Sequence, residues 1–175
     1  MKRIIYYLLL IIALCFVSEV KAQNNYVKLN YGNEMLISGD LHSVNNALGF
    51  EVGHFFTPNS AFVMDYLHGF KKDGVNFNKV GINYLYEFSS SYYFAPFLKC
   101  GVGYKNYGVC YKNYNDDFNG AELNIGFGIN AYLTDYVALS IGFDLSNTAF
   151  IYDSEWHWNW DSSLFTPKIG LSYNF

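Results

Sequence analysis

The feature that most constrains this chain is an alternation of apolar and polar residues that recurs eight times after residue 23. In "VGINYLYEF", for example, Val80, Ile82 and Tyr84 alternate with Gly81 and Asn83. Successive side chains of an extended strand point to opposite faces, so this period of two predicts strands with one apolar and one polar face. No amphipathic helical pattern of useful length follows residue 23. We therefore expect an all-β fold.

Turn-like clusters separate the eight alternating segments. We expect strands over roughly 25–36, 47–57, 61–71, 75–89, 93–107, 118–133, 137–150 and 163–175. The short connections are 57–60, 89–92 and 134–136, the long ones are 37–46, 107–118 and 150–162, and "KKDG" at 71–74 is intermediate. The short connections follow every second strand, which places them at one end together with both termini. An eight-stranded antiparallel up-and-down β-barrel has this layout.

The N-terminal segment has the composition of a secretory signal peptide. Lys2 and Arg3 precede an apolar run over 4–17, and "VKA" ends the segment in a small-x-small cleavage pattern. We predict a signal peptide over 1–22 and one barrel domain over 23–175. The alternative, a retained membrane anchor, is weaker because the run is short for the ~20 residues that a spanning helix needs.

Charge and arginine content exclude some classes of partner. The full chain has a formal net charge of −4, and removal of the signal peptide makes it more negative and takes away Arg3, the only arginine. Nucleic acid is therefore not expected as a partner. Bidentate clamps for phosphate or carboxylate groups, which arginine serves best, are also unavailable.

Two cysteines, Cys100 and Cys110, remain after the signal peptide in a compartment where disulfides form. On one extended strand, ten residues place their Cα atoms about 33 Å apart. A disulfide needs less than about 7 Å. We expect two free thiols, and the alternative is a disulfide for which the chain would fold back after Tyr104.

Alternation alone does not say whether the apolar face points into a soluble, lipocalin-like barrel or outward into lipid. The volume of the apolar face decides between them, because an eight-stranded barrel has an interior barely wide enough for side chains. Large residues crowd this face: Tyr31, Phe50, Phe62, Met64, Tyr66, Tyr84, Tyr86, Phe127, Phe143 and Tyr173. We expect them to face outward, with a soluble periplasmic ligand carrier as the alternative.

The polar face combines glycines with charged side chains of both signs. Glycines leave space for long neighbours in a narrow lumen, and buried charges require partners. We predict a lumenal charge network of five lysines and five carboxylates: Lys28, Lys79, Lys99, Lys105 and Lys168 with Glu51, Asp65, Glu87, Glu122 and Asp144.

Aromatic residues gather at both predicted rims, as two interfacial girdles would. One set is Phe55, Phe56, Tyr92, Tyr93, Tyr132 and Tyr136, and the other is Phe70, Phe77, Tyr104, Tyr107, Phe150 and Tyr152. In lipid every backbone polar group needs a partner, and among strand structures only a closed barrel provides this. The expected fold is a transmembrane β-barrel.

The signal peptide, the eight segments, the glycine-rich "KCGVGYKNYG" and "NIGFGINAYL" and the ending Tyr173-Asn174-Phe175 resemble the small outer-membrane β-barrels of Gram-negative bacteria, of the OmpA and OmpX types. The resemblance covers the chain after residue 22 and rests on pattern. It implies an outer-membrane location, contact with outer-membrane lipid or lipopolysaccharide, and a C-terminal aromatic signal, Tyr173 and Phe175, that is read by the barrel-assembly machinery. We expect no appended peptidoglycan-binding domain of the OmpA kind.

The last long loop, "YDSEWHWNWDSS", contains the sharpest candidates for chemistry. A serine, His157 and a carboxylate can in principle hydrolyse an ester, as in outer-membrane enzymes that act on lipid A. The His-x-Ser pattern that lipid A deacylases carry is absent, since Asn159 follows His157 by two. A surface-contact role is favoured for Trp156, His157, Trp158 and Trp160.

The acidic loop residues form a second candidate site, for a divalent cation. They are Asp116, Asp117, Asp153, Glu155 and Asp161. Their spacing matches no calcium-loop pattern, so a solvated acidic rim is favoured. The scattered histidines are not expected to be ligands. No metal and no cofactor is therefore expected.

These observations favour a non-enzymatic outer-membrane barrel with a structural or surface-interaction role, in envelope integrity, adhesion or recognition of an extracellular ligand through its loops. The alternatives are a lipid A-modifying enzyme, a narrow low-conductance pore and the soluble carrier. Eight strands favour a plugged lumen over a pore, because aqueous channels are typical of barrels with about sixteen strands.

Overall fold

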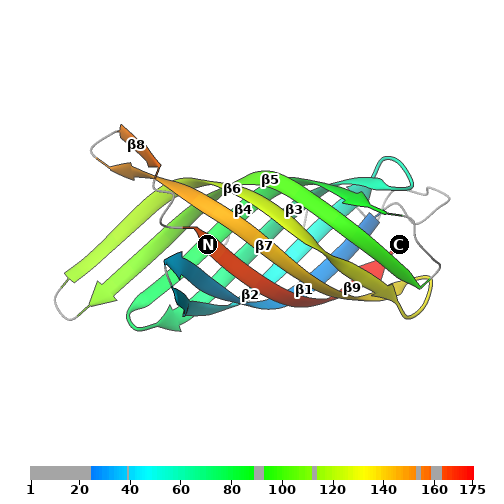
Figure 1. Ribbon diagram of the computed structural model, residues 1–175, viewed down its shortest axis with the longest axis horizontal. Helices are drawn as coiled ribbons and strands as arrows, with labels where there is room; N and C mark the ends of the chain where they lie inside the picture. Colours follow the sequence, from blue (N-terminus) through cyan, green and yellow to red (C-terminus); the bar gives the residue numbers. More distant parts are fainter. Residues whose placement is uncertain (1–24, 39, 89–92, 112–113, 153–154, 159–162) are drawn as a thin grey trace, which may run out of the picture.

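The computed structural model describes the backbone of residues 25–38, 40–88, 93–111, 114–152, 155–158 and 163–175. It describes their side chains as well, except in the ranges 38–43, 109–116 and 150–162. Figure 1 shows a barrel of long, tilted strands. The strands are β1 (Asn25–Ser38), β2 (Asp40–Phe55), β3 (Ser60–Lys72), β4 (Val75–Glu87), β5 (Phe94–Tyr111), β6 (Tyr114–Tyr132), β7 (Val137–Tyr152), β8 (Glu155–Trp158) and β9 (Leu164–Asn174). The predicted signal peptide, 1–22, lies outside the described residues. Within the described residues, the chain contains no helix that could cross a membrane.

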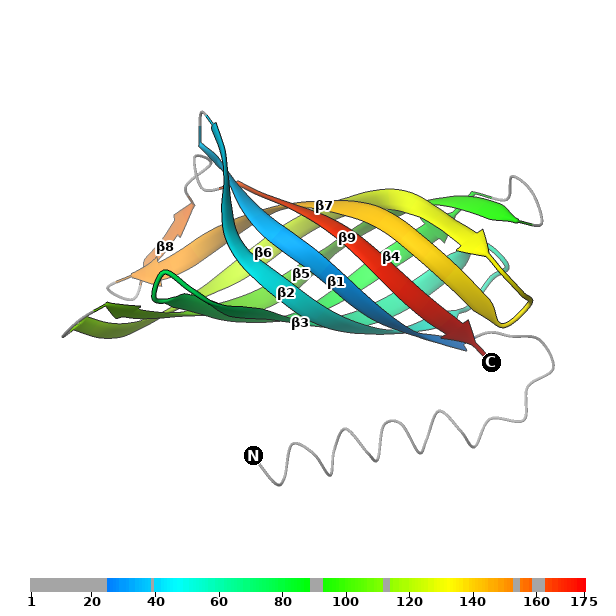
Figure 2. The ribbon, with the colours of Figure 1, turned by 90° about the horizontal axis from the view of Figure 1, so that it is seen from below.

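Eight of these strands close into one antiparallel barrel. Each of β1 to β7 pairs with the next in sequence, and β9 pairs with both β7 and β1. At the closing seam the backbones of Asn25 and Phe175 exchange two hydrogen bonds, of 3.1 and 2.9 Å. In Figure 2, β1 and β9 lie side by side, and β1 begins where β9 ends. The predicted eight-stranded up-and-down barrel, closed by its last strand on its first, is confirmed.

The connections at the termini end are short, as predicted. Threonine hydroxyls cap two of them: Thr57 Oγ1 accepts from the Ser60 N–H at 2.9 Å, and Thr134 Oγ1 accepts from the Val137 N–H at 3.0 Å. Such hydroxyl-to-backbone bonds replace ladder bonds where the chain reverses. The turns join strands that are neighbours in the closed sheet, so no strand of the barrel has an unpaired edge.

The opposite end differs from the prediction. The ranges 37–46 and 107–118 were expected to be long loops, but their described residues continue as paired strands, to Ser38↔Asp40 in one hairpin and Tyr111↔Tyr114 in the other. Pairing satisfies the backbone groups even where the apolar alternation fades. Figure 1 shows the β5–β6 hairpin extending past the other strands. β8 was not predicted, and it pairs with the end of β7 within 150–162.

The β3–β4 connection is a two-residue turn. Asp73 and Gly74 have φ values of 51° and 85°, and both are therefore in the left-handed region. Two consecutive positive φ values match the right-handed twist of the strands in a hairpin, and Asp-Gly is a favoured pair for them. The "KKDG" stretch thus makes a tighter turn than the four residues expected.

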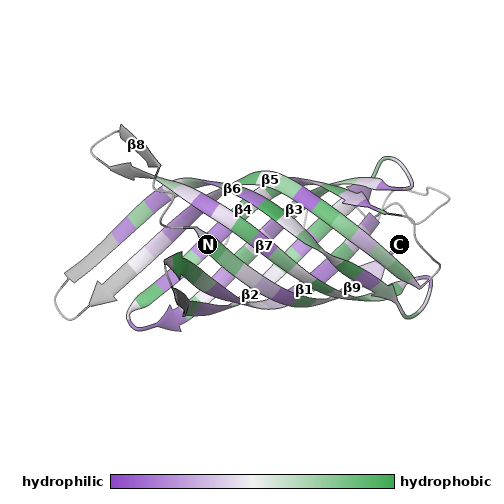
Figure 3. Cartoon of the chain, in the orientation of Figure 1, coloured by the Kyte–Doolittle hydropathy of each residue, from purple (hydrophilic) through white to green (hydrophobic). Residues whose placement is uncertain are grey.

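The two faces of the wall have the predicted orientation. Apolar and aromatic side chains point outward and are exposed, including Leu29, Phe62, Ile82, Ile125 and Leu171, while the charged side chains in the middle of the strands are buried inside. Figure 3 shows the resulting alternation of hydrophobic and hydrophilic positions along the strands of the barrel wall. A soluble carrier would need the opposite arrangement, so the lipocalin-like alternative is wrong.

Candidate functional site

All ten side chains of the predicted charge network point into the barrel. Nine are buried, and Lys168 keeps only 8% of its side chain accessible. They join into two linear chains of ion pairs and one separate carboxylate. Because these groups are withdrawn from water, each needs the partners described below.

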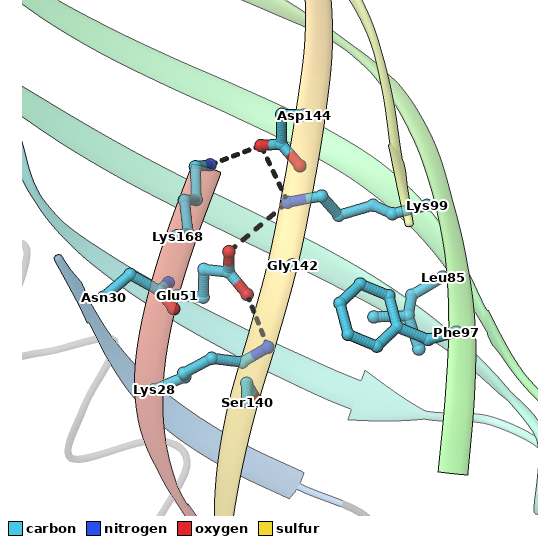
Figure 4. Close-up of a pocket in the computed structure, with 10 residues that line it drawn as sticks. All are labelled: Lys28, Asn30, Glu51, Leu85, Phe97, Lys99, Ser140, Gly142, Asp144 and Lys168. Atoms are coloured by element: carbon cyan, nitrogen blue, oxygen red, sulfur yellow. Dashed lines mark hydrogen bonds and ion pairs between the residues drawn. The ribbon is translucent and has the colours of Figure 1, made fainter. Parts of the chain in front are cut away.

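The first chain, shown in Figure 4, draws on five strands: β1, β2, β5, β7 and β9. Lys28 contacts Glu51 at 3.3 Å, and Glu51 contacts Lys99 at 3.3 Å. Lys99 also reaches Asp144 at 3.4 Å, and Asp144 binds Lys168. The chain therefore links the first and last strands of the barrel to the strands on its far side.

The second chain contains a residue that the sequence analysis missed. Lys79 binds Glu122 and lies 4.0 Å from Asp65, and Glu122 lies 3.5 Å from Lys105. Lys105 in turn binds Glu34, which is 1% exposed. The even count of five charges of each sign is therefore wrong. Glu34 has the same phase as Lys28 in the first predicted strand, and this signal could have found it.

Glu87 is the separate carboxylate, near the short turns. Its oxygens accept hydrogen bonds from Asn130 Nδ2 and from the Tyr132 hydroxyl, the latter at 3.0 Å, and Ser140 Oγ donates to Asn130. No lysine lies within ion-pair distance of Glu87 among the described residues. Amide and phenol donors thus replace the lysine that the sequence analysis expected.

Two apolar clusters lie inside the barrel with the charges. One consists of Tyr26, Ala61, Val63, Leu85 and Phe97, with Phe55 against it. The other consists of Ala47, Leu67 and Phe77, with Tyr107 against it. Phe55, Phe77, Tyr107 and Tyr132 were expected in the aromatic girdles, and they instead fill the lumen. Phe77 has the same phase along its strand as Lys79, and Tyr107 the same as Lys105, so this signal could have placed both rings inside.

Glycines make room for these rings. At Gly53 a Cβ atom would overlap the Tyr26 ring, and at Gly69 it would overlap the Phe77 ring. The polar face is therefore glycine-rich because neighbouring strands place large side chains across it. This agrees with the expectation that glycines on the inward face leave space for long neighbouring side chains.

The space left in the lumen is small. A cavity of about 20 Å³ lies beside the first ion-pair chain, lined by Lys28, Glu51, Leu85, Phe97 and Lys99 among others (Figure 4). This volume suits about one water molecule. Lys105 is also covered, because its Nζ lies 4.4 Å from the centre of the Phe77 ring and 4.8 Å from that of Tyr107. The described lumen is thus filled by side chains.

The carboxylates of the lumen have partners in the part of the chain that the structure describes. They bind lysines, amides or phenols, and no three His, Cys, Asp or Glu side chains gather as a metal site there. Asp117 is exposed, and the other four acidic loop residues have side chains outside the described set. Cys100 is a free, exposed thiol on the outer wall, and the side chain of Cys110 lies outside the description.

The candidate surface-contact residues lie mostly outside the described structure. Backbone positions 156–158 belong to β8, where Trp156 is opposite Ile151 and His157 is opposite Phe150. The side chains of Trp156, His157 and Trp158, and all of Trp160, lie outside the described residues. Their predicted role stays a prediction.

The C-terminal aromatic pair lies on the closing strand. Tyr173 is half-exposed on the outer wall, and its ring stacks on Tyr136 and on Phe175, each at 6.3 Å between centroids. These three rings form a patch at the termini end of the wall. The position suits the predicted assembly signal, which remains a prediction.

A row of polar side chains crosses the outer wall toward the hairpin end, and the sequence analysis did not single it out. His68, Asn78, Asn106 and Asn119 are opposite one another on β3 to β6. The hydroxyls of Tyr66 and Tyr104 donate to Asn78 and Asn119 at 2.9 and 2.6 Å. Tyrosines with the ring in the apolar belt and the hydroxyl on a polar row are typical of a membrane interface.

Solved structures similar to this one are small outer-membrane barrels. Neisserial surface protein A matches with a TM-score of 0.71 and 14% identity, over 86% of this chain and 97% of that protein. The N-terminal barrel domain of Pseudomonas aeruginosa OprF gives 0.65 and 17%, over 89% and 100%. Ail, the attachment invasion locus protein of Yersinia pestis, gives 0.62 and 11%, over 88% and 100%.

At these identities the likeness shows the fold, and the fold is that of the small eight-stranded outer-membrane barrels. No family model matches the sequence. No curated protein matches it either.

Proposed function

We propose that this chain is a non-enzymatic outer-membrane β-barrel protein that acts as a structural scaffold and displays its hairpins and last loop for contact with an extracellular partner. In this proposal residues 1–22 are removed on export, and the barrel domain is 23–175. Short turns face the periplasm and the longer hairpins face outward, as in other such barrels. The barrel-assembly machinery and lipopolysaccharide are its expected partners in the envelope.

The filled lumen is the observation that carries this proposal. Two ion-pair chains and two apolar clusters occupy the interior, and the one cavity described there has about 20 Å³. Over the described residues, an interior of this kind favours a rigid, plugged wall over a path for a solute. Function then belongs to the surfaces outside the lumen, which are the wall and the hairpin end.

The last loop is the surface that we favour for contact with a partner. Trp156, Trp158 and Trp160 supply aromatic area, and His157 lies among acidic residues. Tryptophan and tyrosine dominate binding energy at protein interfaces. Ail has been solved with the heparin analogue sucrose octasulfate. The present chain has no arginine after residue 3 and an acidic loop, so its chemistry favours a neutral or cationic partner over a sulfated one.

The loop gives weaker support to hydrolysis of lipid A, because the His-x-Ser pattern is absent. If His157 were a catalytic base, His157→Ala would abolish deacylation of lipid A by the purified barrel. We expect no such activity in the wild-type protein, and an activity lost in this variant would replace the proposal with an enzyme.

Gel migration and surface labelling test the proposal together. The protein from purified outer membranes should migrate as a compact form in SDS and shift to an unfolded form after boiling. An epitope inserted after Asn159 should bind antibody on intact cells, whereas the same epitope inserted after Pro58, in a short turn, should bind only after permeabilisation. Soluble periplasmic protein without a boiling shift would overturn the membrane location. Antibody access to the Pro58 site on intact cells would overturn the orientation.

A further inference from the structure

The ladder between the first and last strands is interrupted at one point of the wall. Residues opposite each other on β1 and β9 run to Gly32↔Lys168 and resume only at Met35↔Phe165. Pro167 lies in this gap, and a proline has no N–H to donate to a ladder. Prolines are normally excluded from strands that are paired on both sides. The wall is therefore locally irregular at the closing seam.

A groove of about 290 Å³ opens on the outside of the barrel at this irregularity. Its walls are the outward side chains of Tyr31, Ile141, Phe143 and Ile169, and Pro167 is short between them. Gly32 and Gly142, opposite Lys168 on the two neighbouring strands, also line it. Because these two residues have no side chain, only their backbone contributes to the wall beneath the groove.

The groove is surrounded by side chains of the apolar belt. Tyr31 is 50% exposed, Ile141 49% and Ile169 50%, although each is large and apolar or aromatic. The ring of Phe143, which lines the groove, stacks on that of Phe165 at 5.5 Å between centroids. In a membrane, the medium next to this surface is hydrocarbon, so the fitting occupant is a hydrocarbon chain.

The position along the barrel indicates which leaflet the chain would come from. Pro167 is the fourth residue of β9, which runs for 11 residues from the hairpin end to the termini end. On β1 the outward residues Leu29 and Tyr31 are followed by Asn33, which lines the groove and donates from Nδ2 to Asn46 Oδ1 at 2.8 Å. The groove thus runs from apolar wall to a neutral amide pair on the hairpin side.

We propose that this groove binds one acyl chain of a lipid A molecule in the outer leaflet, with the ester or amide linkage of the chain beside Asn33 and Asn46. The inference rests on the proposed outer-membrane location. It adds a specific lipid site to a wall that otherwise contacts lipid without selectivity. Neutral amides suit a carbonyl linkage, and Lys168, the one cationic side chain among the described residues that line the groove, is turned inward onto Asp144.

A pair of proline substitutions tests the site. Pro167→Ile fills the groove with a branched outward side chain and restores an N–H to the ladder. Pro96→Ile is the matched control, because Pro96 lies on β5 opposite Ile129, on the outer wall and outside the groove lining. Native mass spectrometry of the detergent-purified barrels, incubated with purified lipid A or with dipalmitoyl phosphatidylethanolamine, measures the lipid bound per barrel.

We expect the wild type and Pro96→Ile to retain one lipid A, and Pro167→Ile to retain at least ten-fold less. Equal retention by all three barrels would overturn the site, and equal retention of phosphatidylethanolamine would overturn the assignment to lipid A. If Pro167→Ile did not fold, Ile169→Trp would fill the groove from its side. A boiling-dependent gel shift in every variant separates failure of this site from failure of the proposed membrane location.

Discussion

At the scale of single residues, the inward face of this barrel follows one rule: a charge is buried only where a partner on another strand reaches it. Lys99, for example, joins Glu51 and Asp144, which lie 48 and 45 residues away in sequence. Alternation predicted which side chains point inward. Alternation could not predict which charges form ion pairs, since that depends on how far each strand is shifted along its neighbours around the barrel.

Lys105→Met tests the cost of breaking such a pair. The substitution leaves Glu34 without its ion-pair partner at a site that is almost fully buried. Removing one member of a buried pair typically costs ~3–5 kcal/mol, because the other charge stays uncompensated. We expect a loss of that size in the free energy of unfolding, measured by urea titration of the refolded barrel in lipid vesicles.

Two further variants complete this experiment. Adding Glu34→Gln to Lys105→Met should recover part of the loss, since no buried carboxylate is then stranded at position 34. Lys71→Met, at an exposed lysine, should change stability by less than about 0.5 kcal/mol. A double variant as unstable as Lys105→Met alone would mean that packing, and not charge, is what Lys105 contributes.

Ile125→Arg tests the outward face in the same assay. Ile125 is 56% exposed on the wall of β6. An arginine on the lipid face costs ~2–4 kcal/mol near the membrane midplane and ~0–1 kcal/mol near an interface. We expect the larger loss for Ile125→Arg and the smaller one for Leu133→Arg, beside a short turn. The reverse ranking would show that Ile125 does not lie near the centre of the membrane.

At the scale of strands and hairpins, the sequence located the membrane-crossing segments and misjudged where they end. Across the belt, one face meets lipid and the other meets the lumen, so the residue pattern is strict. Where a hairpin extends past the lipid, nothing requires the alternation of apolar and polar residues, although the backbone still pairs. This explains why 37–46 and 107–118 looked like loops, and why Glu155–Trp158 gave no signal as a strand.

Phe175→Ala tests whether the last residue of the closing strand has a role beyond pairing. The backbone bonds between Asn25 and Phe175 survive this change. We expect less folded barrel in outer membranes, by several-fold on unboiled gels, but unchanged refolding of the purified protein into detergent. An equal defect in both measurements would assign the ring a structural role in the Tyr136, Tyr173 and Phe175 patch.

At the scale of the whole molecule, the fold could be predicted because a membrane restricts which strand structures are possible. A chain whose strands expose apolar side chains needs closure to pair every backbone group, and eight segments allow one simple barrel. The groove at Pro167 was not predicted, because it arises from the juxtaposition of strands. For the two inner apolar clusters, alternation indicates which side chains point inward, but which of them meet depends on strands that are distant in sequence. The partner of the last loop was not predictable either, since surface loops carry specificity without periodic pattern.

Conductance measures the filled interior directly. Because side chains occupy the lumen and barrels with aqueous channels have about sixteen strands or more, purified protein in a planar bilayer should give a featureless trace. A known porin reconstituted in the same bilayer serves as the positive control. Discrete current steps that change size in Glu51→Gln or Lys99→Met would contradict a plugged lumen.

The ion-pair chain from Lys28 to Lys168 also affects the order in which contacts form during folding. Two of its four ion pairs, Lys28–Glu51 and Asp144–Lys168, join neighbouring strands and can form as those strands pair. The other two, from Lys99 to Glu51 and to Asp144, join strands that are not neighbours in the sheet. Contacts between distant parts of a chain form late and slow its folding. The two pairs of Lys99 are therefore completed only when the sheet curls into the closed barrel, and in a half-built sheet Lys99 stays without these partners.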